Sequence, residues 1–292
     1  MAELSPVAGL WIGGSLTWLE RLCLASFVRM GHPTALYTYG EVAGVPEGVE
    51  IRDGTTVVPT DDFTVHERSG SVALFSDLFR YHMMRKVPGT IWIDTDVFCL
   101  RPIDTGGPHV FGYEVQSTGE MNGAVLRLPP DSPALQLLLD LTADPYVIPE
   151  FVSAPAQARM RAAAEAGTPV HASGMRWGIW GPLAITWATR KTGEDRFCQH
   201  RDVFYPLPFK ERNAVFKRPA KLERFLTPDS QAIHIWGRIK RYSGGVHGGT
   251  VPAGCWLARR LAEFGMDPAE YPVTGHGRLS YETEAPDTQE AQ

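Results

Sequence analysis

The chain has 292 residues and a mass of 32.2 kDa, and its 43% hydrophobic and 21% charged residues exclude collagen-like, coiled-coil and wholly disordered chains. With 28 Lys and Arg against 33 Asp and Glu, the net charge is −5, which argues against a dedicated nucleic-acid-binding protein. No apolar run approaches the ~18–20 residues that cross a bilayer, and no cationic segment opens the chain. We therefore expect a soluble, cytoplasmic protein.

The first forty residues alternate between strand and helix patterns. An apolar strand is predicted over 7–12, a helix with apolar residues at helical spacing runs from Ser15 to about Phe27 and stops before Gly31, and a second strand is predicted over 35–39. This order is typical of a βαβ unit, which places two parallel strands side by side.

The next predicted pair of elements ends in two carboxylates. A helix over 71–86 is broken by Pro88 and Gly89, and the strand over 90–93 runs directly into Asp94-Thr95-Asp96. The carboxyl end of a buried strand is where open α/β sheets bind ligands. The first half of the chain therefore predicts an α/β fold, with a mostly parallel, Rossmann-type sheet flanked by helices.

The second half is less regular. A strand over 122–128 and helices over 132–141 and 154–166 are predicted, and nine basic residues against three acidic ones between 208 and 241 indicate an anionic ligand or surface. We expect one domain over 1–280, with a ligand-binding part at about 5–130 and a second part with a mobile lid at 131–280. The acidic tail 281–292 is predicted to be disordered.

The Asp94-Thr95-Asp96 segment is the strongest chemical signal. Paired carboxylates bind hard cations such as Mg²⁺ or Mn²⁺, although two acidic residues in a loop are commonly a solvated turn. Apolar residues on both sides of the pair argue for burial, and buried carboxylates need partners. Asp77 and Arg80 share a face of the preceding helix, either as a simple ion pair or as part of the same site.

Two blocks of sequence resemble the DXD-containing glycosyltransferases of the GT-A fold. This family includes bacterial polysaccharide and lipooligosaccharide enzymes, α-1,4-galactosyltransferases and, more distantly, the clostridial glucosylating toxins. The blocks are Trp11-Ile12-Gly13-Gly14 with the βαβ unit that follows, and Ser76-Asp77-Leu78-Phe79-Arg80-Tyr81 through Asp94-Thr95-Asp96.

The resemblance implies a nucleotide-sugar donor and a bound Mn²⁺ or Mg²⁺. It implies that Asp96 and His234 ligate the metal, and that Asp94 contacts the ribose or reaches the metal through a water. The catalytic set it implies is Asp77, Arg80, Asp94 and Asp96.

The donor-binding residues implied by the resemblance come from four parts of the chain. Trp11 stacks on the base or fills the core, Asp77 and Arg80 hold sugar hydroxyls, and Asn122 presents its amide to the sugar. The full set is Trp11, Ile12, Gly13, Ser76, Asp77, Arg80, Trp92, Asp94, Asn122, Trp236, Arg238 and Lys240. Trp236, Arg238 and Lys240 would close over the diphosphate, and Trp180-Gly181-Pro182 would shape the acceptor side.

The reaction implied by the resemblance is transfer of a hexose from a nucleotide sugar, expected to be a UDP-sugar, to a glycan or glycolipid hydroxyl with retention of configuration. Surface polysaccharides or lipid-linked sugars as acceptors would place the protein at the inner face of a membrane. Two alternatives stay open: a haloacid-dehalogenase-like phosphotransferase with Asp94 as nucleophile, and a non-catalytic glycan-binding protein.

Overall fold

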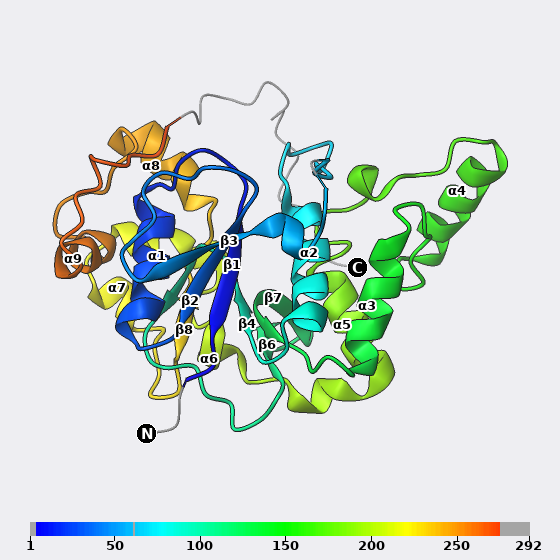
Figure 1. The fold of residues 1–292 in the computed structure, drawn as a ribbon, viewed down its shortest axis with the longest axis horizontal. Helices are drawn as coiled ribbons and strands as arrows, with labels where there is room; N and C mark the ends of the chain where they lie inside the picture. The colour runs from blue at the N-terminus through cyan, green and yellow to red at the C-terminus, as the bar shows by residue number, and fades with distance from the viewer. Residues whose placement is uncertain (1–3, 61, 275–292) are drawn as a thin grey trace.

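A six-stranded sheet forms the centre of the molecule in the computed structural model, which describes residues 4–60 and 62–274 (Figure 1). The strand order is β3-β2-β1-β4-β7-β6. The first four strands are parallel, whereas β7 runs antiparallel to β4 and to β6. The strands are β1 (Val7–Trp11), β2 (Thr34–Thr38), β3 (Val49–Asp53), β4 (Ile91–Ile93), β6 (Val110–Val115) and β7 (Glu120–Arg127). The predicted α/β fold with a mostly parallel sheet is confirmed, while the tail 281–292 lies outside the described residues.

Helices cover both faces of this sheet. They are α1 (Trp18–Arg29), α2 (Ala73–Lys86), α3 (Pro133–Ala143), α4 (Ala154–Glu165), α5 (Pro182–Thr192), α6 (Arg201–Phe204), α7 (Ala220–Glu223), α8 (Ile239–His247) and α9 (Trp256–Glu263). Short 3-10 helices span Gly54–Thr56, Ala172–Gly174, Glu194–Phe197 and Phe209–Phe216.

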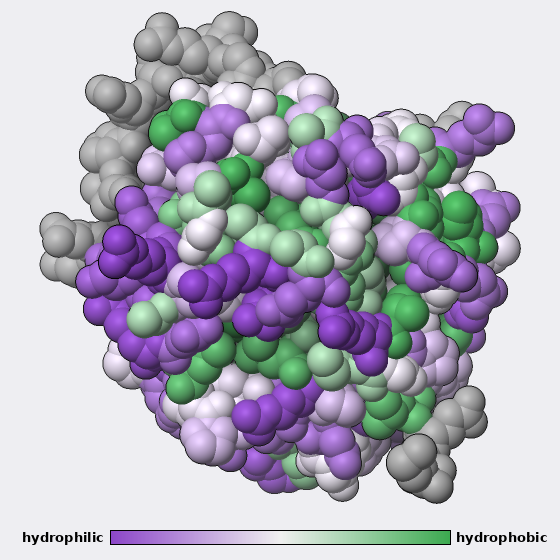
Figure 2. Space-filling model, turned by 90° about the vertical axis from the view of Figure 1, so that its left-hand side faces the viewer, coloured by the Kyte–Doolittle hydropathy of each residue, from purple (hydrophilic) through white to green (hydrophobic). Residues whose placement is uncertain are grey.

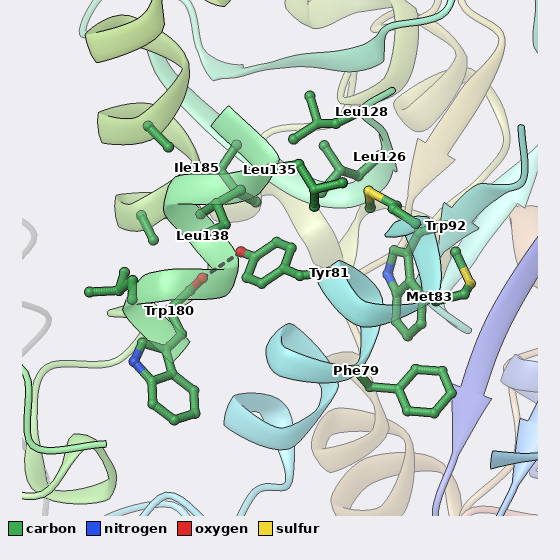
Figure 3. Close-up of a cluster of buried hydrophobic side chains, with 14 of the residues drawn as sticks. Phe79, Tyr81, Met83, Trp92, Leu126, Leu128, Leu135, Leu138, Trp180 and Ile185 are labelled. Carbon is green, nitrogen blue, oxygen red and sulfur yellow. Dashed lines mark hydrogen bonds between the residues drawn. The ribbon is translucent and has the colours of Figure 1, made fainter. Parts of the chain in front are cut away.

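The alternation of side chains along the strands places two of the hydrophobic clusters of the core on opposite faces of the sheet. Val7 and Ile91 pack with Phe27 of α1 on one face, whereas Ala8 and Trp92 pack on the other face with the helices α2, α3 and α5. Figure 3 shows this second cluster, which includes labelled side chains from α2, α3, α5 and β7. Each face is therefore buried under its own helical layer, as a parallel sheet requires.

Helix α1 begins two residues later than the sequence indicates. Thr17 rather than Ser15 is its N-cap, in a capping box in which the Thr17 side chain accepts from the Glu20 backbone N–H and Glu20 Oε2 accepts from the Thr17 backbone N–H at 2.9 Å. The Thr17 hydroxyl also donates to Glu20 Oε2. Gly31, with a φ of +90°, ends the helix segment as predicted. This cap leaves the second carboxylate oxygen of Glu20 available to another partner.

Helix α2 is tied to the start of α5 through a buried tyrosine. The Tyr81 hydroxyl donates a hydrogen bond to the Trp180 carbonyl oxygen, and Figure 3 shows this bond between α2 and the segment before α5. Gly181 follows, and a Cβ at this position would lie 3.0 Å from both carboxylate oxygens of Asp77. The N-terminus of α5 therefore lies directly against the Asp77 side chain of α2.

A separate pair of short strands brings the late part of the chain to the segment that follows the central strand β4. Strand β5 (Val97–Cys99) pairs antiparallel with β8 (Ala232–His234), with Val97 opposite His234. The Ile235 backbone N–H extends the pairing with a 2.9 Å hydrogen bond to the Asp96 carbonyl oxygen. As a result His234 lies next to the segment that follows β4.

Two surface features complete the fold. Helix α4 projects from the body in Figure 1, and none of its residues is buried. Figure 2 shows the face on which α8 and α9 lie, where a broad band of strongly hydrophilic residues crosses the surface. In the part of the chain that the structure describes, no helix is long and apolar enough to span a bilayer.

Candidate active site

Three potential metal ligands meet at the carboxyl end of β4. One ligand atom each from Asp94, Asp96 and His234 lies within 4.8 Å of the other two. Asp94 and Asp96 follow β4 directly, and His234 is the last residue of β8. The structure thus brings together the three residues that the resemblance to GT-A glycosyltransferases implies as metal ligands, with Asp94 directly or through a water.

Asp96 and His234 form a close pair. His234 Nε2 lies 3.2 Å from Asp96 Oδ1, and the Gly237 backbone N–H donates to Asp96 Oδ2. Burial raises the pKa of Asp96, but the His234 charge and these hydrogen bonds outweigh it, so the net pKa is lowered. For His234, burial acts to lower the pKa, but the Asp96 charge outweighs burial, so the net pKa lies above its usual value. In the absence of another ligand, the pair therefore favours a carboxylate beside an imidazolium.

The His234 ring also carries an unused polar atom. Its Nδ1 is buried and has no hydrogen-bond partner among the described residues. A buried polar atom without a partner costs free energy, on the order of 1–3 kcal/mol. The environment of this histidine is therefore not optimised for a purely structural role.

Arg80 links the neighbouring carboxylates. Its Nη2 lies 3.1 Å from Asp77 Oδ1 and 3.3 Å from Asp94 Oδ1, while its Nη1 donates a 2.7 Å hydrogen bond to the Gly123 carbonyl oxygen. The Arg80 and Asp77 side chains are only 7% and 8% exposed. A Cβ at position 123 would lie 2.5 Å from Arg80 Nη1, so glycine is what allows this close approach.

The Asp94 side chain is held in place by a residue of β4, the strand that precedes it. The Trp92 indole Nε1 donates a 2.7 Å hydrogen bond to Asp94 Oδ1, and the Asp94 side chain is 28% exposed. Trp92 itself is 1% exposed and contacts Asp94 through this N–H group. Its ring packs against the Arg80 guanidinium, 4.9 Å from its centroid. Trp92 therefore positions Asp94 and Arg80 rather than offering a surface to a ligand.

Asp77 has a titration behaviour that can be tested. Burial raises its pKa to about 7 against an ordinary value of 3.8, and the Arg80 charge only partly opposes this. Because the folded pKa is the higher one, the fold binds the proton more tightly than the unfolded chain does. The free energy of unfolding should therefore fall as the pH rises from about 4 to about 7, by up to roughly 1.4 kcal/mol per pH unit.

The matched variant is Asp77→Asn, which cannot titrate. We expect urea unfolding to show wild type losing stability relative to this variant between pH 5 and pH 8. Equal pH dependence in the two proteins would contradict the assignment of this titration to Asp77.

Asn122 is engaged on both sides of its amide. Its Nδ2 donates a 2.7 Å hydrogen bond to Glu114 Oε2, and its Oδ1 accepts one from the Ala124 N–H, also 2.7 Å. The buried Tyr205 hydroxyl accepts from the Val125 N–H and donates to the Asn122 carbonyl oxygen. Glu114 and Tyr205 were missed in the sequence because neither belongs to a recognisable motif. The antiparallel β6–β7 pairing, which places Gly112 opposite Asn122, brings Glu114 within hydrogen-bond distance of the Asn122 side chain.

The aromatic residue at the end of β1 lies beside a lysine from α8. Lys240 Nζ is 5.3 Å from the Trp11 ring centroid and forms a 2.6 Å ion pair with Glu20 Oε1, whose side chain is only 2% exposed. Trp11 Nε1 is buried and has no hydrogen-bond partner among the described residues. Gly13, with a φ of +153°, and the half-buried Ile12 follow it. Glu20 had no signal in the sequence beyond its capping position.

Trp236 lies directly over the His234 ring. The two ring centroids are 3.9 Å apart at an interplanar angle of 33°, and Phe209 packs edge-on against Trp236 at 5.2 Å. Among the described non-glycine residues, Trp236 alone has a positive φ, of +67°. This conformation turns the chain so that the Gly237 N–H reaches Asp96.

The structure brings most of the proposed residues together, but not all of them. Asp77, Arg80, Trp92 and Asp94 form one connected group, and Lys240 is close enough to Asp96 to influence its pKa. The Asn122 side chain bonds to Glu114 and Ala124 instead, next to Gly123, whose carbonyl oxygen accepts from Arg80. The half-buried Ser76 offers Arg80 Nε its carbonyl oxygen at 3.4 Å. Arg238 is exposed before α8 and contacts none of these groups.

Comparisons with known proteins show similarity only to solved structures. No family model matches the chain, and no curated protein matches it. The chain is similar to the PaToxG glycosyltransferase, with 13% identity over 64% of this chain and 68% of that one, at a TM-score of 0.39. It is also similar to a transferase described as a mutant, with 13% identity over 59% of this chain and 88% of that one, at a TM-score of 0.34. Likenesses at this level assign no activity, so function has to be argued from the site.

Proposed function

We propose that this protein is a metal-dependent glycosyltransferase. It transfers a hexose from a nucleotide sugar, a UDP-sugar in the first instance, to a hydroxyl of a glycan or glycolipid acceptor with retention of configuration. The observation that supports this proposal is the cluster of Asp94, Asp96 and His234 at the carboxyl end of β4, joined directly to the buried Arg80 and Asp77.

The donor set of this cluster fits Mn²⁺ or Mg²⁺. Two carboxylates supply the oxygen ligands that both ions prefer, and a neutral imidazole suits Mn²⁺ in particular. His234 Nδ1 has no hydrogen-bond partner among the described residues, and the Asp94 side chain is partly exposed. Both observations are consistent with a bound group that contacts these residues. When bound, the cation would neutralise charge on the diphosphate of the donor.

The remaining groups suit the other parts of a nucleotide sugar. Trp11 offers an aromatic surface for the base, and Lys240 beside it supplies a positive charge for the diphosphate. Asp77 and Arg80 would hold sugar hydroxyls, with Arg80 oriented by its bonds to Gly123 and Asp94. Fixed charges of this kind stabilise the negative charge that grows on the leaving oxygen. The departing phosphate oxygen would accept the proton of the acceptor hydroxyl.

Thermal unfolding with nucleotide sugars tests the proposal. UDP-glucose, UDP-galactose, UDP-N-acetylglucosamine and GDP-mannose are each added with and without Mn²⁺. A ligand at a hundred times its Kd stabilises the folded state by about 2.7 kcal/mol. We expect at least one UDP-sugar to raise the Tm only when Mn²⁺ is present, and UDP to be released on incubation.

Two results would contradict the proposal. The first is the absence of any Mn²⁺-dependent shift with all four sugars. The second is a burst of phosphate from 4-nitrophenyl phosphate, which would instead favour Asp94 as the nucleophile of a phosphotransferase.

A further inference from the structure

A hollow lies between the β6–β7 hairpin and α5, and none of its lining residues belongs to the candidate active site. Its volume is about 700 Å³, within the range of about 300–1,000 Å³ typical of small-molecule sites. Its lining combines residues of the hairpin, the segment before α4 and α5. They are Thr118, Glu120, Glu150, Phe151, Leu183, Thr186, Trp187, Arg190 and Lys191.

The lining suits a neutral ligand with both apolar and polar surfaces. Phe151, Leu183 and Trp187 form an apolar part, with the two ring centroids 5.3 Å apart. The charged residues on the lining are two carboxylates, Glu120 and Glu150, and two cations, which balance. A different hollow of about 450 Å³, along residues 210–224, is lined by five cations and one carboxylate and would suit an anion instead.

Most of the charged groups on the first hollow are already engaged. Glu150 accepts hydrogen bonds from Trp187 Nε1 at 2.6 Å and from Lys191 Nζ at 2.5 Å. Arg190 donates to the carbonyl oxygens of Thr118 and Gly119, at 3.0 and 2.8 Å. These bonds hold the aromatic part of the lining and the hairpin in place, so the hollow is preformed.

Glu120 is the exception among these groups. Within residues 4–60 and 62–274, its carboxylate accepts no hydrogen bond and forms no ion pair, although it is half-buried. Burial, followed by the nearby charge of Glu114, raises its pKa, and the charge of Arg176 opposes this only in part. Its two oxygens therefore remain free to accept hydrogen bonds from hydroxyl groups of a ligand.

Strand β7 and helix α5 both run from the active site to this hollow. Ala124 of β7 accepts a hydrogen bond from the Asp94 N–H, and Glu120 lies four residues away on the same strand, about 13 Å along it. Helix α5 begins beside Asp77 at Gly181 and contributes Leu183 and Trp187 to the hollow. Glu120 and Asn122 lie on the same face of β7 because they are two residues apart.

We propose that this hollow binds the part of a glycan acceptor that extends beyond the sugar being modified. This inference rests on the proposed glycosyl transfer, since it identifies the acceptor as an oligosaccharide chain. The apolar faces of its sugar rings pack against Trp187 and Phe151, and its hydroxyls donate hydrogen bonds to Glu120. The balanced charge of the lining favours neutral sugars over anionic ones.

Binding of neutral trisaccharides to the full chain tests this proposal without any catalysis. Maltotriose, cellotriose and tri-N-acetylchitotriose are titrated into ¹⁵N-labelled protein, and the indole N–H signal of Trp187 is assigned with Trp187→Phe. We expect at least one trisaccharide to shift this signal, and its monosaccharide to bind at least tenfold more weakly. Glu120→Gln should weaken the trisaccharide about tenfold, while Trp177→Ala, at an exposed tryptophan outside the hollow, should not change its affinity.

The outcomes separate this inference from the proposed function. If none of the three trisaccharides shifts the Trp187 signal, or if Glu120→Gln and Trp187→Ala both bind as wild type does, the hollow is not an acceptor site. A positive titration with no nucleotide-sugar-dependent Tm shift in wild type would retain a glycan-binding hollow and reject glycosyl transfer. Because Trp187→Ala removes packing against Phe151, Glu120→Gln is the variant that preserves the shape of the site.

Discussion

Replacing Asp96 with asparagine should lower Mn²⁺ affinity and donor turnover by roughly 100-fold or more, while the fold stays intact. Loss of even an outer-shell partner typically costs 10–100-fold at metal sites, and Asp96 is proposed as a direct ligand. The asparagine keeps the size of the side chain and can still accept the Gly237 N–H, but it lacks the negative charge. Mn²⁺ binding by electron paramagnetic resonance and release of UDP from a UDP-sugar measure the two effects.

The matched control for this variant is Asp131→Asn. Asp131 is exposed and has no side-chain partner among the described residues, so its replacement removes the same charge away from the site. We expect it to retain wild-type Mn²⁺ affinity. If Asp96→Asn binds Mn²⁺ as tightly as this control does, Asp96 is not a metal ligand.

Replacing Arg80 with methionine should have the largest effect on stability. The change removes the charge that partners the buried Asp77 and leaves the Gly123 carbonyl oxygen without its donor. Breaking one side of a buried ion pair costs about 3–5 kcal/mol. Urea unfolding measures the loss. Arg85→Met serves as the control, since Arg85 is an exposed residue of the same helix with a hydrogen bond to Gln136.

The pH dependence of that loss provides a second check. Without Arg80, the pKa of Asp77 should rise further above about 7. The buried carboxyl is then neutral at pH 5, whereas at pH 8 its ionisation has no cation to offset it. The destabilisation by Arg80→Met should therefore be smaller at pH 5, and the double variant Asp77→Asn/Arg80→Met should lose less than the two single losses combined. Additive losses that are the same at both pH values would show that Asp77 and Arg80 are not coupled.

The parallel half of the sheet could be predicted because local patterns determine it. The apolar runs at β1, β2 and β4 and the helical spacing in α1 and α2 are local signals, and Asp94 and Asp96 follow a buried strand by sequence position alone. The strand predicted over 122–128 was placed within two residues of β7 at its start and one at its end. These elements need no distant partner to be recognised.

The parts of the fold and of the site that could not be predicted depend on contacts between segments distant in the sequence. Strand β3 lies in a turn-rich stretch that gave no strand signal, because it is an edge strand with its Ile51 side chain 53% exposed. The approach of His234 to Asp96 depends on β5–β8 pairing, and the ion pair of Glu20 with Lys240 on the packing of α8 near α1. The resemblance to GT-A enzymes indicated His234 without knowledge of this pairing, whereas Glu114 and Tyr205 had no signal in the sequence and Glu20 had none beyond its capping position.

The short pairing of β5 with β8 has a consequence for how the molecule opens. Each strand has three residues, and the proposed ligands adjoin both: Asp96 precedes β5 and His234 ends β8. A cation bound there would fasten the late part of the chain to its early part, so occupancy would add directly to the free energy of local opening. Cleavage of residues 230–274 by a protease should therefore slow with rising Mn²⁺ concentration, so the cleavage rate would report the occupancy of the site.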